Sequence, residues 1–226
     1  MRRTVGVAFA GALAVAWLVA ACGRMAAPPR EPLLAEEHND LGVAYYAGGE
    51  HERAARQFRQ ALALRPGWPG TLVKLGDAEL ALGRVEAAIA AYEAAHRASP
   101  GDPAIANNLA WALLQDDRRW PQAEPIIQSA LALEPRPRGY YLDTQGVLLL
   151  RKGDLQGALE TLRAALSDQD LRDRQARALV LRHAAQALRR LGDREAAERC
   201  EHLAQATESG EGPGAREGIG GSEALC

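Results

Sequence analysis

The sequence predicts an all-α fold of tandem helical hairpins, and three observations support that prediction. Residues of similar type recur at a fixed offset of 34 positions, which is typical of a repeat protein. Within the repeated unit, the apolar residues follow helical spacing. The chain is 47% hydrophobic but only 5% aromatic, and an interior of alanine and leucine suits packed helices better than a β-sandwich.

Residues 1–21 predict a secretory signal peptide. Arg2 and Arg3 precede an apolar run that extends over residues 5–21. A transmembrane anchor is the alternative, but a run of about 17 residues is at the short limit for a helix that spans a bilayer. The segment Val19-Ala20-Ala21-Cys22 resembles the lipobox of bacterial lipoproteins. That resemblance implies that Cys22 becomes the lipidated first residue of the mature protein.

The lipobox resemblance also implies a location. Acyl chains on Cys22 would hold the protein at a membrane, since each buried methylene contributes roughly 0.8 kcal/mol. Gly23 follows, where aspartate would retain the protein in the inner membrane under the family's sorting rule. We therefore expect the outer membrane, with the protein facing the periplasm. Residues 22–34 include Pro28, Pro29 and Pro32 and predict a semi-extended tether.

The repeated unit is clearest over residues 41–66. Its seven marker residues are Leu41, Gly42, Tyr45, Ala54, Phe58, Ala61 and Pro66. An offset of 34 gives Leu75, Gly76, Glu79, Ala88, Tyr92, Ala95 and Pro100, and only the Tyr45 position changes character. Gly42 should allow close approach of a second helix, whose Ala54, Phe58 and Ala61 form one stripe. Gly49 should permit a left-handed turn, and Pro66 should end the second helix.

This unit resembles the tetratricopeptide repeat, a helix–turn–helix of 34 residues. The resemblance implies a right-handed superhelical solenoid of about five repeats, preceded by the signal peptide and the tether. We place the array at residues 35–206, with repeats at about 35–68, 69–102, 103–138, 139–172 and 178–206. The third repeat has Ala110 in place of the glycine and one inserted residue near 116–121. There, Pro121 suits the first turn of the second helix, and Pro125 should make the start of that helix irregular.

The end of the chain predicts a polar capping helix over residues 194–206 and a disordered tail over residues 207–226. The tail has six glycines and four glutamates, so it cannot bury enough apolar surface to fold. Cys200 and Cys226 are left as a candidate disulfide pair, which an oxidising periplasm would permit. Two free thiols are the alternative.

No catalytic, metal-binding or cofactor-binding motif is visible. The five histidines lack zinc-ligand spacing, and Cys200 and His202 lie too close along a helix to face one another. The net charge of −2 gives no indication of nucleic-acid binding. Residues 172–199 contain eight arginines and four acids, which indicates either a docking patch for an acidic partner or polyanion, or a solvated helix face. We therefore expect no enzyme and no cofactor.

The family resemblance implies a concave groove, lined by the first helix of each repeat, that binds protein partners. The register of the family places these residues there: Asn39, Val43, Tyr46, Val73, Asp77, Asn107, Trp111, Tyr140 and Asp143. Trp111, Tyr46 and Tyr140 are the expected anchors, although Trp111 could instead fill space around the inserted residue. Asn39 and Val43 replace the lysine and asparagine with which some members grip a carboxyl terminus, so we do not expect that mode.

Together these features predict a lipid-anchored interaction scaffold for an envelope assembly, such as a pilus, a secretion system or exopolysaccharide export. A regulatory accessory subunit of a cell-wall or polysaccharide enzyme is the alternative. The identity of the neighbouring genes would discriminate between the two.

Overall fold

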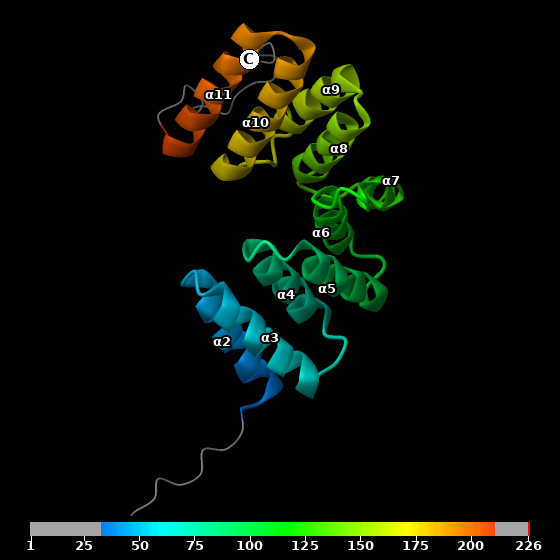
Figure 1. Ribbon diagram of the computed structural model, residues 1–226, viewed down its shortest axis with the longest axis vertical. Coiled ribbons are helices and arrows are strands. Elements are labelled where there is room, and N and C mark those ends of the chain that lie inside the picture. The colour runs from blue at the N-terminus through cyan, green and yellow to red at the C-terminus, as the bar shows by residue number, and fades with distance from the viewer. Residues whose placement is uncertain (1–32, 211–225) are drawn as a thin grey trace, which may run out of the picture. The chain divides into compact units, whose positions relative to one another are not determined.

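The computed structural model describes residues 33–210 and Cys226, and the residues from Leu34 onward form one compact unit. The predicted signal peptide, Cys22, nearly all of the tether and residues 211–225 lie outside the described residues. The described chain is helical throughout (Figure 1). Its helices are α2 (Ala35–Ala47), α3 (His51–Leu64), α4 (Pro69–Ala81), α5 (Val85–Ala98), α6 (Pro103–Leu114), η1 (Trp120–Gln122), α7 (Ala123–Ala132), α8 (Gly139–Lys152), α9 (Leu155–Leu166), α10 (Arg174–Leu191) and α11 (Arg194–Ser209).

The helices form five consecutive hairpins, each packed against the next. The pairs are α2 with α3, α4 with α5, α6 with α7, α8 with α9, and α10 with α11. The first helices of successive hairpins also touch one another, from α2 through α4, α6 and α8 to α10. They therefore make one layer of the stack and the second helices make the other. This is the all-α repeat solenoid that the sequence predicts.

The close approach within each hairpin is confirmed at the predicted glycines. A methyl group added at Gly42 would lie 2.5 Å from the Phe58 ring, and one at Gly76 would lie 2.6 Å from the Tyr92 ring. At Gly146, the same methyl group would lie 2.6 Å from Leu162. Three repeats therefore place a large side chain directly against a bare backbone. In the third repeat, Ala110 and Ile127 are both fully buried in one core cluster, because an isoleucine leaves room for the methyl group that an aromatic ring would exclude.

The turn predictions hold in the first repeat. Helix α2 ends at Ala47, and Gly49 adopts a left-handed φ of 75°. Helix α3 ends at Leu64, just before Pro66. The second and fourth hairpins turn on the equivalent Gly83 and Gly153, with φ of 71° and 85°.

The structure corrects the expectation for the insertion in the third repeat. Residues Trp120–Gln122 form a separate 3-10 turn, η1, so Pro121 precedes the second helix instead of opening it. Helix α7 begins at Ala123, and Pro125 falls within its first turn. An N–H in that turn has no partner inside the helix, so the missing donor of Pro125 costs little. Trp120 packs against the core beside the insertion.

Two predicted boundaries near the C-terminus were wrong by several residues. Helix α10 begins at Arg174 instead of residue 178, because the Asp173 carboxylate caps it by accepting hydrogen bonds from the Gln175 and Ala176 N–H groups at 2.8 and 3.1 Å. Helix α11 continues through Ser209, where the tail was expected to start at Thr207. Glu208 accepts two hydrogen bonds from Arg182 at 2.8 and 2.6 Å, which anchors this last turn and lowers the pKa of Glu208.

The Cys200 and Cys226 sulfurs form a disulfide in the structure, across Cα atoms 4.8 Å apart. Cys200 is fully buried in the core of the last two repeats. The Cys226 side chain packs against the cluster of Ala178, Leu181 and Ala204, and its carbonyl accepts a hydrogen bond from Arg199 Nε. The end of the chain is therefore held against α11.

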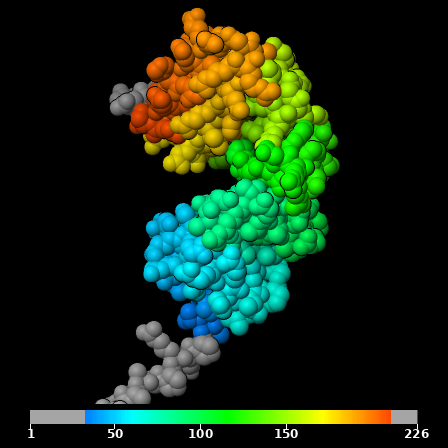
Figure 2. All heavy atoms as spheres, viewed as in Figure 1, coloured from blue at the N-terminus to red at the C-terminus, as the bar shows by residue number. Residues whose placement is uncertain are grey.

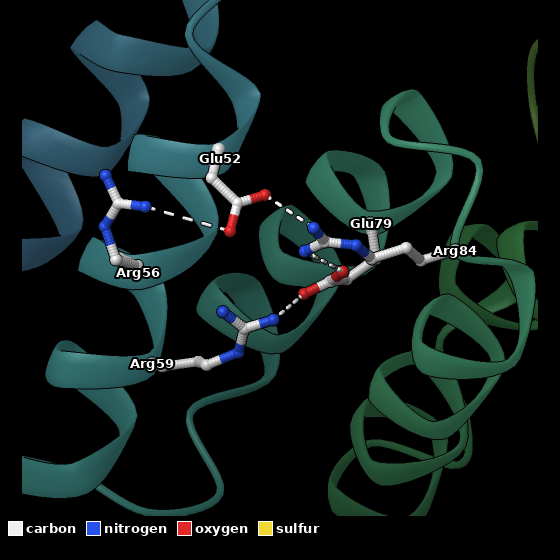
Figure 3. A network of polar contacts seen from close by, with 5 residues as sticks. All are labelled: Glu52, Arg56, Arg59, Glu79 and Arg84. Carbon is white, nitrogen blue, oxygen red and sulfur yellow. Dashed lines mark hydrogen bonds and ion pairs between the residues drawn. The ribbon is translucent and has the colours of Figure 1, made fainter.

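A buried carboxylate joins the first two repeats. Glu79 stands where the first repeat has Tyr45, and it is only 1% exposed. Arg59 of α3 forms an ion pair with it, and Arg84, the residue before α5, lies 3.6 Å away (Figure 3). Arg84 also pairs with Glu52 at 2.7 Å. The penalty of burying the charge is offset by two guanidinium groups, whose own exposed edges stay hydrated.

Replacing Gly76 with alanine should lower the free energy of unfolding by about 1–3 kcal/mol, because the new methyl group would displace the Tyr92 ring. Gly70→Ala is the matched control in the same helix, since a methyl group there would meet nothing closer than 4.0 Å. Urea denaturation followed by circular dichroism measures both. Equal stability of the two variants would contradict the close-approach argument.

Candidate functional site

The N-terminal part of the predicted groove is largely occupied by its own side chains. Asn39 is buried, and its Oδ1 accepts hydrogen bonds from Thr71 Oγ1 at 3.0 Å and Lys74 Nζ at 3.2 Å. Asn39 therefore ties α2 to α4 and is not available to a peptide backbone. Val43 and Tyr46, by contrast, remain exposed on α2.

Asp77 in this region is also engaged internally. The Tyr92 hydroxyl donates a 2.5 Å hydrogen bond to the Asp77 carboxylate. Burial raises the pKa of Asp77, and the Tyr92 hydrogen bond and nearby Lys74 only partly oppose that shift. Burial, together with the Asp77 charge, raises the pKa of Tyr46 and of Tyr92. Val73 is half-buried against the core, so this part of the groove offers few free polar groups.

The first helices of the last three repeats line a cavity. It is a pocket of about 500 Å³ between the first helices α6, α8 and α10. In Figure 2 an indentation of the surface separates yellow α10 from the blue-green second repeat, and the green third repeat lies at its inner end. The lining residues are Trp111, Leu114, Gln115, Val147, Leu150, Arg151, Leu179, His183, Gln186 and Arg190. We call this cavity the C-terminal pocket.

A histidine from α10 links three repeats at the wall of this pocket. His183 Nδ1 and Asp143 Oδ1 are 2.7 Å apart, and both side chains are largely buried. The His183 ring lies 5.8 Å from the Trp111 ring between centroids. Asp143 thus fixes the orientation of the imidazole, and the imidazole packs against one side of the indole. In the tautomer that donates from Nδ1 to Asp143, Nε2 is the ring nitrogen that remains free.

The lining of the pocket contains a histidine held by an aspartate but no nucleophilic side chain. A histidine held by an aspartate is the base and orienting half of a catalytic triad, but the lining residues include no serine, threonine or cysteine that could act as nucleophile. In residues 33–210 and Cys226, no group of three or more His, Cys, Asp or Glu side chains could hold a metal ion. No helix in the same part of the chain is long and apolar enough to cross a membrane.

The structure brings together only some of the predicted groove residues. Trp111 lines the pocket and Asp143 supports it through His183, whereas Asn39, Val43, Tyr46, Val73 and Asp77 belong to the first two repeats. Asn107 lies one helical turn before Trp111, and its Oδ1 is buried without a hydrogen-bond partner among the described atoms. Tyr140 is 37% exposed in the first turn of α8 and is not part of the lining; burial and Asp173 raise its pKa.

Sequence reasoning missed the contribution of α10. Leu179, His183, Gln186 and Arg190 all line the pocket, and their spacing of four, three and four residues is that of one helix face. With residue 178 as the start of the fifth repeat, the groove register would have found two of them, Leu179 and Gln186, at the second and ninth positions. Three of the eight arginines in residues 172–199 pair with glutamates of the last repeat: Arg182 with Glu208, Arg189 with Glu201, and Arg199 with Glu195. Part of the arginine-rich stretch is therefore used to hold the last repeat together.

A family model described as "Tetratricopeptide repeat" matches three overlapping segments, residues 39–103, 73–139 and 107–172. The chain belongs to the tetratricopeptide-repeat family. Members of such repeat families generally act as protein-interaction scaffolds, and we assign that general role to this chain. No curated protein sequence matches it.

Solved structures agree with the fold. The crystal structure of the APC/C hetero-tetramer Cut9–Hcn1 contains a chain that is 21% identical to this protein, with a TM-score of 0.68. The match covers 78% of this chain and 35% of that chain, so this protein spans about a third of the length of the matched chain. MamA from Desulfovibrio magneticus RS-1 is 17% identical, with a TM-score of 0.60 and 78% and 96% coverage. A thermophilic repeat protein of Thermus thermophilus is 23% identical, with a TM-score of 0.61 and 80% and 93% coverage.

Ionisation of Asp77 should destabilise the folded protein. Burial raises the pKa of Asp77 above the ordinary 3.8, because the neutral carboxyl group is favoured in the folded protein. The stabilisation from the neutral form is fully present below pH 3.8 and is lost as the pH rises through the raised pKa. Asp77→Asn keeps an oxygen that can accept the Tyr92 hydrogen bond but cannot ionise. The free energy of unfolding of the variant should therefore increase relative to that of the wild type between about pH 4 and pH 7. Urea denaturation at several pH values measures this, and a pH-independent difference would contradict it.

Proposed function

We propose that this protein is a lipid-anchored lipoprotein that faces the periplasm and uses the C-terminal pocket to hold a protein partner within an envelope assembly. The observation that carries the proposal is the position of Trp111. It is half-buried at the wall of a pocket that three repeats build together, beside a histidine held by Asp143. An aromatic side chain fixed in this way can contribute a large share of binding energy.

The mixed lining of the pocket supports a protein ligand. Leu114, Val147 and Leu150 provide an apolar floor, of which Leu114 and Leu150 are almost fully buried. Gln115 and Gln186 provide amide donors and acceptors that can pair with a peptide backbone. Apolar surface with a few placed polar groups is typical of a binding site.

The envelope location rests on the N-terminal sequence. The basic start, the apolar run and the lipobox-like segment that ends in Cys22 support export and lipidation. The Cys200–Cys226 disulfide is compatible with that location, because such bonds persist in oxidising compartments. The outer membrane is favoured by Gly23. Assemblies for pili, secretion or exopolysaccharide export fit a tethered scaffold of this kind.

Regulation of a cell-wall or polysaccharide enzyme is the second candidate, with the chain as an accessory subunit. The same pocket would then hold the enzyme. The partner recovered by cross-linking and mass spectrometry separates the two candidates, since an assembly component supports the first and a synthase or hydrolase supports the second.

Trp111→Ala should weaken capture of envelope partners from solubilised membranes by roughly 30-fold, which corresponds to a hot-spot loss of about 2 kcal/mol. Trp68→Ala is the control, because Trp68 lies outside the pocket and stacks with Arg65, whose guanidinium carbon is 4.4 Å from the ring centroid. Circular dichroism should show equal helicity for both variants. Undiminished capture by Trp111→Ala would place the binding surface elsewhere.

Cys22→Ser should abolish labelling with a radioactive or clickable palmitate analogue and release the protein from the membrane fraction. The acyl chains would be the main source of membrane affinity, so their loss should be decisive. Cys200→Ser provides a matched control that leaves the lipobox intact. Continued sedimentation of the Cys22→Ser protein with membranes would disprove the lipid anchor.

A further inference from the structure

The C-terminal pocket has an excess of positive charge at its rim. Two guanidinium groups line it, Arg151 near the end of α8 and Arg190 near the end of α10. No carboxylate is among the lining residues. Two carboxylates contact lining residues: Asp143 is engaged by His183, and Asp117 pairs with Arg151.

Arg190 differs from the other arginines around it. Arg182, Arg189 and Arg199 each pair with a glutamate, but within residues 33–210 and Cys226 no carboxylate lies within 4.0 Å of Arg190. Its Nη1 donates a hydrogen bond to the Leu150 carbonyl near the end of α8. That contact fixes the guanidinium plane, and the remaining N–H groups of its planar fork have no hydrogen-bond partner among the described atoms.

Arg151 holds a carboxylate that is easily replaced. It pairs with Asp117 at 2.9 Å, but the Asp117 side chain is 94% exposed. An ion pair in such a position contributes little to stability, because water competes for both charges. An incoming carboxylate could therefore take the place of Asp117 at small cost.

Apolar surface lies beside these charges. Leu179 is 38% exposed on α10, although its neighbours Ala178 and Val180 are fully buried. It lines the pocket together with Trp111. A ligand that satisfies the pocket must therefore present an apolar side chain and a negative charge close together, and a purely polar polyanion would leave the leucine and the indole uncovered.

We propose that the C-terminal pocket selects an acidic peptide segment of the partner, in which an aliphatic or aromatic residue lies within one or two positions of an aspartate or glutamate. The apolar side chain packs against Trp111 and Leu179, and the carboxylate binds Arg190, with Arg151 able to receive a second one. This inference rests on the proposed function, because it assigns a partner chemistry to the same pocket.

Selection of phage-displayed random twelve-residue peptides on the full chain in mild detergent tests this specificity. The wild type should enrich peptides that pair an apolar residue with a nearby acid. A labelled synthetic copy of the best peptide should bind Arg190→Gln at least tenfold more weakly by fluorescence polarisation. Arg97→Gln is the matched control: Arg97 also lies in the last turn of a helix and is exposed, but outside the pocket, so its affinity should change less than twofold.

Asp117→Asn tests whether the Asp117 carboxylate competes with the peptide for Arg151. Removal of this carboxylate should leave the affinity for the peptide unchanged or increase it. Because the Asp117 side chain is 94% exposed, the substitution should not disturb folding. Enrichment of peptides without acids, failure to enrich any peptide, equal binding by Arg190→Gln, or weaker binding by Asp117→Asn would overturn the inference. If Trp111→Ala loses peptide binding but Arg190→Gln does not, the pocket remains the binding site and only the preference for acidic peptides is refuted. If neither variant loses binding, the C-terminal pocket is not the binding site.

Discussion

The close approach of the two helices within a hairpin is the constraint on which the rest of the structure depends. At Gly42 and Gly76, an aromatic ring from the second helix occupies the space where any other residue would place a β-carbon. Each first helix is thereby seated at a fixed depth on its partner. The first four hairpins repeat this arrangement or a close substitute for it. The first helices of all five hairpins contact one another in order from α2 to α10, and the proposed binding surface lies on this layer.

We place the proposed site in the last three repeats because the polar groups of the first helices have different partners in the two halves of the array. In the first two repeats, Asn39 bonds to Thr71 and Lys74, Asp77 accepts the Tyr92 hydroxyl, and Glu79 is held by arginines. These groups stabilise the stack. In the last three repeats, the internal Asp143–His183 pair positions an imidazole and an indole at a cavity, while Arg190 keeps donors free. The polar groups of the first two repeats therefore stabilise the stack, whereas those of the last three repeats surround the proposed binding pocket.

The sequence was sufficient to predict the hairpins and their packing, because the 34-residue offset and the small–large alternation describe local geometry. It did not reveal that Glu79 would be buried, since the arginines that neutralise it come from α3 and from the turn before α5. The pairing of His183 with Asp143 spans 40 residues and depends on the packing of α8 against α10. Helix α11 extended past Ala206 because the Arg182–Glu208 pair supports it, a contact that tail composition could not indicate. Of the predicted groove, Trp111 and Asp143 contribute to the pocket, and the α10 residues were overlooked because the groove register was not extended into the fifth repeat.

Site-specific photo-cross-linking in living cells can show directly whether a protein partner binds at the C-terminal pocket. A benzoylphenylalanine residue would replace Leu179 in the C-terminal pocket or, in a second strain, Leu64, which is 58% exposed on the second helix of the first repeat. If the partner binds in the pocket, position 179 should give a discrete protein adduct that is absent or much weaker from position 64. A strong adduct at position 64 with none at position 179 would contradict binding in the pocket and place the partner on the opposite layer of the array.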